Sequence, residues 1–127
     1  MLQKYLIYCS MFLSVQMFGQ GDNAFFNAIK NNDMATVGSY FQEQVDFCLF
    51  ENQESLNKKE ALARLNQFLN NQKPQSIEII HQGVSKGKTS QFKIAKLTTA
   101  KDTYRVFVYS KSNAGHNAIM EIRIDKF

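Results

Sequence analysis

The spacing of apolar residues changes partway along this chain. From Asp22 to about Leu69 most apolar residues recur at helical spacing, whereas from Ser76 to Phe127 they mostly alternate, as in β-strands. Helices followed by a run of strands are typical of an α+β fold, in which the helices pack on one face of an antiparallel sheet. The pattern therefore predicts a fold class, and it contains no catalytic or metal-binding signature.

The first part of the chain predicts three amphipathic helices. Asp22 or Asn23 can cap a first short helix, and Asp33 can cap a second one. Asn57, with Glu60 three residues later, resembles a capping box at the start of a third helix. The expected apolar positions of these helices are Phe25, Ala28, Ile29, Met34, Val37, Phe41, Ala61, Leu62, Leu65, Phe68 and Leu69.

The strands are predicted around the third helix. One strand is expected before it, at about residues 44–50, and four follow it, at about residues 76–84, 90–99, 104–110 and 117–126. The connections between the later strands contain Gly, Asn and Asp, which are turn formers. Long strands joined by short turns predict a twisted antiparallel meander that curls around the helices.

The first residues read as an export signal. Lys4 precedes an apolar run from Tyr5 to Phe18, and the small residue Gly19 follows. The run is shorter than the roughly 20 residues that span a membrane, so no stable membrane span is expected after cleavage. We expect a signal peptide at residues 1–19 and a single domain at residues 20–127, exported to the periplasm or the extracellular space. A buried N-terminal helix or an uncleaved anchor is the alternative interpretation.

Charge and cysteine content exclude some classes of function. The chain has 15 basic and 11 acidic side chains, and the basic ones are scattered along it, so no nucleic-acid partner is expected. If residues 1–19 are removed, Cys48 is the only thiol, and it is expected to be a small buried residue rather than a reactive one. No disulfide can then form within the chain.

Both faces of the later strands carry apolar groups. Val106 and Val108 alternate with Phe107 and Tyr109, and we place Ile119 of the last strand on the same outer face as these two aromatic residues. An uncovered apolar face often marks a partner surface, so a homodimer through the sheet is expected. The alternative is a single curled sheet that tolerates a few surface aromatic residues.

Several local segments carry a resemblance to a known family. They are residues 26–33 (FNAIKNND), 40–41 (YF), 45–47 (VDF), the helix at 61–68, residues 81–83 (HQG) and residues 104–107 (YRVF). In these segments and in the order helix, helix, strand, helix and four strands, residues 22–127 resemble the nuclear transport factor two-like superfamily, which has a cystatin-like fold. Among its members, the chain looks most like small exported Bacteroidetes domains of unknown function. The resemblance implies a cone, made by a curved sheet wrapped on three helices with a pocket at its wide end, and implies no reaction.

Enzymes of that superfamily use Asp or His as a base in the cone, with Tyr or Asp as hydrogen-bond donor. The candidate bases here are Asp46 and His81, and His81 is expected to share an inner face with Ile77 and Ile79. Further polar candidates are Tyr104, Arg105, Tyr109 and Arg123. We assign none of them a catalytic role, because spacing alone supplies no orienting partner. No metal ligands, cofactor or phosphate-binding loop are recognised.

These observations predict a non-catalytic exported binding domain. It would hold a small apolar or amphipathic ligand in the cone, or a protein partner through the sheet. The residues expected to line the pocket are Phe25, Tyr40, Phe68, His81 and Tyr104. One alternative is an isomerase or dehydratase that uses His81 or Asp46. Another is a structural or assembly role in the periplasm.

Overall fold

The computed structural model describes residues 24–113 and 116–127, so the signal peptide predicted at residues 1–19 lies outside the described residues. Residues 24–30 form a first helix. The elements that follow are α2 (Met34–Tyr40), β1 (Phe41–Leu49), β2 (Asn52–Asn57), α3 (Lys58–Gln72), β3 (Pro74–Val84), β4 (Ser90–Thr99), β5 (Thr103–Asn113) and β6 (His116–Lys126).

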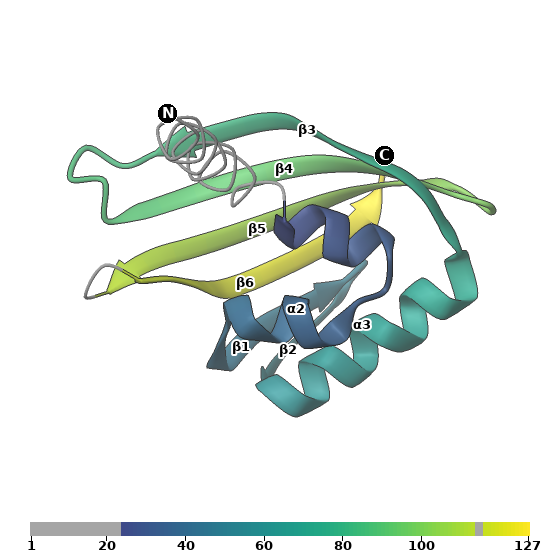
Figure 1. Ribbon diagram of the computed structural model, residues 1–127, viewed down its shortest axis with the longest axis horizontal. Coiled ribbons are helices and arrows are strands. Elements are labelled where there is room, and N and C mark those ends of the chain that lie inside the picture. The colour runs from purple at the N-terminus through teal and green to yellow at the C-terminus, as the bar shows by residue number, and fades with distance from the viewer. Residues whose placement is uncertain (1–23, 114–115) are drawn as a thin grey trace, which may run out of the picture.

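The helices lie on one face of a six-stranded sheet (Figure 1). The strand order is β2-β1-β6-β5-β4-β3, and every pair is antiparallel except β1 and β6, which run parallel. The α+β class and the mostly antiparallel sheet are therefore as predicted. Among the described residues, no helix is both long enough and apolar enough to cross a membrane.

The caps predicted for the second and third helices are confirmed. The Asp33 carboxylate accepts from the backbone N–H of Thr36 at 3.3 Å and from its hydroxyl at 2.6 Å, and these hydrogen bonds lower the pKa of Asp33. The Asn57 side chain accepts from the N–H of Glu60 at 2.8 Å. Lys73 ends α3 in a left-handed conformation, with φ at 58°. Capping in both helices uses side chains within three residues, which is why sequence predicts it.

β2 was not predicted, and the expected order of one strand between the second and third helices is wrong. The segment is polar, and only Leu56 among its residues is buried, so it has no alternating pattern to reveal a strand. It forms a strand because it pairs with β1 from Leu49 opposite Asn52 to Gln44 opposite Asn57. The two-residue turn between them places Phe50 at a φ of 58°, a left-handed conformation that is uncommon for an aromatic residue.

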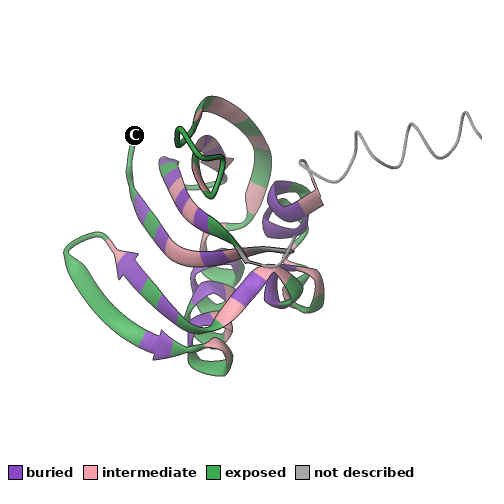
Figure 2. Cartoon of the chain, turned by 90° about the vertical axis from the view of Figure 1, so that its left-hand side faces the viewer, coloured by how far each residue is buried: buried purple, intermediate pink, exposed green. Residues whose placement is uncertain are grey.

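The hydrophobic core lies between the helices and the inner face of the sheet. Residues along the strands alternate between buried and more exposed (Figure 2). The largest fully buried side chains come from every layer: Phe47, Ile29, Leu65, Leu69, Leu97, Ile122, Ile124, Val37, Val45 and Val106. Cys48 is buried as predicted, at 5% exposure.

Two of the register irregularities in the sheet are bulges that change the face to which candidate residues point. In β3, Ile79 pairs with Ala95 and His81 pairs with the adjacent Ile94, so Ile80 is an extra residue. In β6, Ile119 pairs with Ser110 and Glu121 pairs with Tyr109, so Met120 is extra. Because side chains alternate along a strand, one extra residue reverses the inner and outer positions beyond it.

Candidate functional site

The aromatic residues predicted to line a pocket form two pairs in the core. Phe25 and Tyr40 are in edge contact, with ring centroids 5.6 Å apart. Phe68 of α3 and Tyr104 of β5 are in edge contact at 5.2 Å. Phe25, Phe68 and Tyr104 are each buried. These residues therefore pack in aromatic contacts within and beside the hydrophobic core.

Phe50 covers the second pair from the β1–β2 turn. Its ring lies 6.2 Å from that of Phe68 and 6.0 Å from that of Tyr104, and the residue is 40% exposed. Its backbone N–H donates to the carbonyl of Ile124 in β6 at 2.8 Å. The left-handed turn thus places an aromatic ring at the surface, directly over two core aromatic residues.

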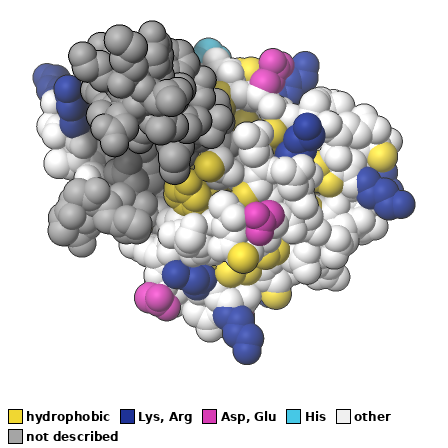
Figure 3. Space-filling model, in the orientation of Figure 1, with side chains coloured by type: hydrophobic (Ala, Val, Ile, Leu, Met, Phe, Trp, Pro, Cys, Tyr) yellow, Lys and Arg dark blue, Asp and Glu magenta, His cyan; other side chains and the backbone are white. Residues whose placement is uncertain are grey.

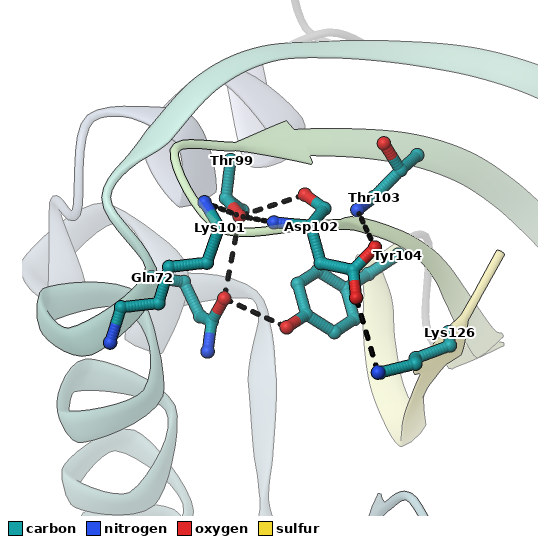
Figure 4. Close-up of polar contacts among 7 residues, drawn as sticks. All are labelled: Gln72, Thr99, Lys101, Asp102, Thr103, Tyr104 and Lys126. Atoms are coloured by element: carbon teal, nitrogen blue, oxygen red, sulfur yellow. Dashed lines mark hydrogen bonds and ion pairs between the residues drawn. The ribbon is translucent and has the colours of Figure 1, made fainter.

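A hydrogen-bond network joins the end of α3 to the turn between β4 and β5 (Figure 4). The Tyr104 hydroxyl donates to Gln72 Oε1 at 2.7 Å. The Thr99 hydroxyl oxygen accepts from the backbone N–H groups of Lys101 and Asp102 at 3.2 and 2.9 Å, and the hydroxyl donates to the Asp102 carbonyl at 2.8 Å. These bonds satisfy the polar groups of the turn and attach it to the helix.

Tyr104 and Asp102 of this network are both held in their ordinary charge states. Burial raises the pKa of Tyr104, so its phenol stays neutral. The backbone N–H of Thr103 and the ammonium of Lys126, 3.2 Å from the carboxylate, lower the pKa of Asp102. A neutral donor and a stable carboxylate stabilise the turn, and neither is poised to exchange a proton near neutral pH.

His81 and Asp46, the two candidate bases, both lie on the outer face of the sheet and are exposed. The expectation that His81 shares a face with Ile77 and Ile79 is wrong, because the bulge at Ile80 reverses its side. Asp46 pairs with Glu121 on β6, and Glu121 shares the outer face with Tyr109. Neither residue points into the core between the helices and the sheet.

The outer face of the strands β3, β4 and β5 carries a cluster of apolar side chains. We call this cluster the outer aromatic face; it consists of Phe92, Ile94, Phe107 and Tyr109, together with Gly83, which lies beneath the Phe92 ring. The rings of Phe92 and Phe107 stack with centroids 6.1 Å apart and an interplanar angle of 21°. Phe92 is 37% exposed, and Ile94, Phe107 and Tyr109 are partly buried.

Gly83 lets the Phe92 ring lie flat against the sheet. The two residues are paired across β3 and β4. A Cβ atom at Gly83 would come within 2.4 Å of the Phe92 ring, so any side chain there would displace the ring. The absence of a side chain at this position therefore orients the outer aromatic face.

Charged groups of both signs surround the outer aromatic face. The pairing of the strands aligns four charged residues in one row across the outer face from β3 to β6: Glu78, Lys96, Arg105 and Asp125. On β6, Arg123 lies 3.7 Å from Glu121. The ring of Phe127 stacks on Lys96 and Arg105, with 5.1 and 5.4 Å between each charged group and the centroid.

Comparison with known proteins identifies the family of the domain. Residues 23–125 match the family described as "Domain of unknown function (DUF4783)". The chain belongs to this family. A solved DUF4783 protein from Bacteroides uniformis is 27% identical, with a TM-score of 0.76 over 83% of this chain and 95% of that one. A DUF4783 protein from Bacteroides ovatus is 25% identical, with a TM-score of 0.76 over 82% and 93%.

More distant structures share the fold. An NTF2-like protein from Cytophaga hutchinsonii is 12% identical, with a TM-score of 0.64 over 88% of this chain and 97% of that one, which shows the shared fold. The fold expected from the resemblance to the nuclear transport factor two-like superfamily is therefore confirmed. Comparison with curated proteins gave no match.

The predicted outer-face residues of this DUF4783 domain are only partly correct. Phe107 and Tyr109 lie on the outer face. Ile119 does not, because it is 5% exposed and belongs to the hydrophobic core. The bulge at Met120 places Ile119 on the inner face, opposite Ser110.

Sequence reasoning missed Phe92, Ile94 and Gly83 as members of the outer aromatic face. Phe92 and Ile94 alternate with Lys93 and Ala95, so the period of β4 already separated the two faces. What the sequence lacked was the pairing that puts Phe92 beside Tyr109 and Ile94 beside Phe107. The sequence did contain one signal, Gly83 within a strand, because a glycine there often marks a site where another group lies close to the backbone.

The surface of the described residues includes three shallow hollows. One, of about 370 Å³, lies between the first helix and β3, and the two others border α3. None of these three is lined by the predicted pocket residues. On the helical side, basic side chains are spread over the surface, with acidic ones among them (Figure 3). Within the described residues, no group of three His, Cys, Asp or Glu side chains is placed to hold a metal ion.

Proposed function

We propose that this DUF4783 domain is an exported, non-catalytic binding domain that recognises a protein partner through the outer aromatic face, and that this partner is a second copy of the chain. The stacked pair Phe92 and Phe107 carries the proposal, because large apolar rings on a sheet surface gain most by being covered. The cone shape that the superfamily implies leaves this outer side of the sheet free for an interface.

The charges around the face favour self-association. A two-fold interface places the same surface patch on both subunits, so the patch must complement itself. Acidic groups (Glu78, Glu121, Asp125) and basic groups (Lys96, Arg105, Arg123) occur on the same face. A face with both signs can pair with its own copy, whereas a face of one sign would repel it.

The positions of the candidate bases support binding rather than catalysis. A general base needs an orienting partner and a substrate site that excludes water. His81 and Asp46 are exposed on the outer face. Within the described part of the chain, neither forms a side-chain hydrogen bond or ion pair.

The proposed location rests on the sequence. The basic start, short apolar run and small residue of residues 1–19 are the features of a secretory signal peptide. Secretion of the full-length chain, with mass spectrometry of the mature N-terminus, tests this part. Retention of an intact N-terminus on the cytoplasmic side would contradict it.

A second candidate is a small apolar ligand bound beside Phe50. This residue combines a left-handed backbone with a ring that is 40% exposed over Phe68 and Tyr104. A bulky residue in that conformation is strained, and strain of this kind is concentrated at functional sites. Native mass spectrometry of the freshly purified protein tests it, since a co-purified small molecule lost in Phe50→Gly would support the ligand.

Molar mass by light scattering at a low and a high concentration tests the principal proposal. The wild-type domain should reach the mass of a dimer at the high concentration, and Phe107→Lys should remain a monomer. Val84→Lys is the matched control, because Val84 is 62% exposed and lies outside the outer aromatic face. A wild-type monomer at both concentrations, or equal loss of the dimer in Val84→Lys, would contradict the proposal.

A further inference from the structure

The edge strand β2 presents unpaired backbone groups. The backbone N–H of Phe50 donates to Ile124 of β6. Because the backbone N–H and C=O groups of alternate residues in a strand point to opposite neighbours, those of Val45, Phe47 and Leu49 point to β2. The backbone groups of their partners on β2, which are Leu56, Glu54 and Asn52, point back to β1. The N–H and C=O groups of Gln53 and Ser55 therefore point away from the sheet, and no described residue pairs with them.

The opposite edge of the sheet contains proline, bulges and glycine, whereas β2 contains none of them. β3 begins at Pro74, has register shifts around Gln75 and Ile80, and contains Gly83. Proline, bulges and glycine are the features by which proteins prevent an edge from pairing with another strand. β2 has an unbroken register with β1 and contains no proline, glycine or lysine.

Figure 2 shows the hairpin of β1 and β2 extending at the lower left, with β2 largely exposed. The outer backbone of β2 is therefore reachable by an extended chain. Neighbouring strands lie about 4.8 Å apart, so an added strand would continue the six-stranded sheet at this edge.

The hairpin is acidic although the whole chain is basic. Residues 41–57 contain four acidic side chains and no lysine or arginine, in a chain of net charge +4. Glu43 is 3.7 Å from Lys58, and Glu54 is 2.6 Å from Arg64. Asp46 and Glu51 form no ion pair among the described residues, so their charge is available to a partner.

This charge distribution determines which occupant fits. A second copy joined edge to edge would bring two acidic hairpins together, and like charges that face each other oppose binding. An extended segment with lysine or arginine would meet opposite charge. Ser55 is opposite Asp46, and its small side chain leaves room for a long basic side chain to reach that carboxylate.

We propose that β2 is a docking edge to which an extended basic segment of a partner protein adds as a seventh strand. The backbone of Gln53 and Ser55 supplies the hydrogen bonds, as in other cases of strand addition, and Asp46 and Glu51 select positive side chains. The backbone groups that this surface offers lie on β2, whereas the outer aromatic face lies on β3, β4 and β5.

Titration with a capped eight-residue peptide of alternating lysine and threonine, followed by amide NMR, tests the proposal. The amide signals of Gln53 and Ser55 should shift, and their hydrogen exchange should slow. The same peptide with glutamate in place of lysine should show no binding, and a peptide N-methylated at alternate residues should bind at least about tenfold more weakly. Equal binding of the N-methylated peptide would overturn strand addition.

Matched variants of the protein complete the test. Asp46→Lys combined with Glu51→Lys should weaken the lysine peptide by about tenfold or more. Glu78→Lys, on the opposite edge, should leave its affinity within about twofold. Equal weakening by Glu78→Lys, or no shift at Gln53 and Ser55, would overturn the proposal. So would edge-to-edge dimerisation of the domain that Ser55→Pro abolishes.

Discussion

The two faces of this sheet carry similar side chains in opposite surroundings. On the inner face, Val106 and Ile122 are fully buried beneath the helices. On the outer face, Phe92 and Phe107 stack on each other and remain partly open to solvent. The inner side chains have already lost their contact with water, whereas the outer ones still have apolar area to bury. The comparison indicates that the inner face determines stability and the outer face is available for binding.

The largest expected effect is in the core between the helices and the inner face, where Leu65 of α3 is fully buried. Leu65→Ala should lower the free energy of unfolding by about 2–5 kcal/mol, because it removes a fully buried side chain and leaves a cavity. Urea denaturation of the monomer measures it. A loss below about 1 kcal/mol would mean that the core is loosely packed and that the contrast between the faces is weaker than the structure indicates.

Tyr104→Phe should lower the free energy of unfolding by about 1 kcal/mol at neutral pH, because Gln72 loses the hydrogen bond from the phenol. It should also change the pH dependence. The folded pKa of Tyr104 lies above the unfolded value, so its contribution is present below the unfolded pKa of about 10 and is lost as pH rises through the folded pKa.

Denaturation curves measured from pH 8 to pH 11 test this dependence. The variant should lose less stability than the wild type over the alkaline part of the range. Identical pH profiles would show that the Tyr104 phenol is not shielded from water in the folded domain.

Asn57→Ala should lower the free energy of unfolding by about 1 kcal/mol, because the N–H of Glu60 loses its cap at the start of α3. Thermal unfolding followed by circular dichroism measures it. Asn57→Asp is the matched control, since its carboxylate can still accept the hydrogen bond and should retain the wild-type stability. Loss of stability in the control would show that the cap acts through something other than this bond.

The smallest effect on stability is expected on the outer face. Phe107→Ala should cost the monomer about 1 kcal/mol or less, since the residue is only partly buried and loses mainly its stacking with Phe92. Denaturation at a concentration where the wild type is monomeric measures it. A loss as large as that of Leu65→Ala would remove the distinction between the two faces.

The helices and the later strands were predictable because their signals are local. The caps at Asp33 and Asn57 act over three residues, and the alternation of β4 and β5 is visible within one strand. The members of the candidate site were less predictable. The sequence places His81 and Ile119 on the wrong face for the same reason: each is next to the extra residue of a bulge, His81 after Ile80 and Ile119 before Met120. A bulge is defined by the pairing of two strands, and neither strand carries it alone.

Sequence by itself determined the α+β class, the capped helices and the residues able to form the core, because periodicity and capping depend on near neighbours. Tertiary structure alone decided that the polar segment Asn52–Asn57 is a strand, that His81 faces outward and that Ile119 faces inward. Each of these depends on a partner strand, and pairing between distant segments is set by the packing of the whole sheet rather than by the local order of side chains.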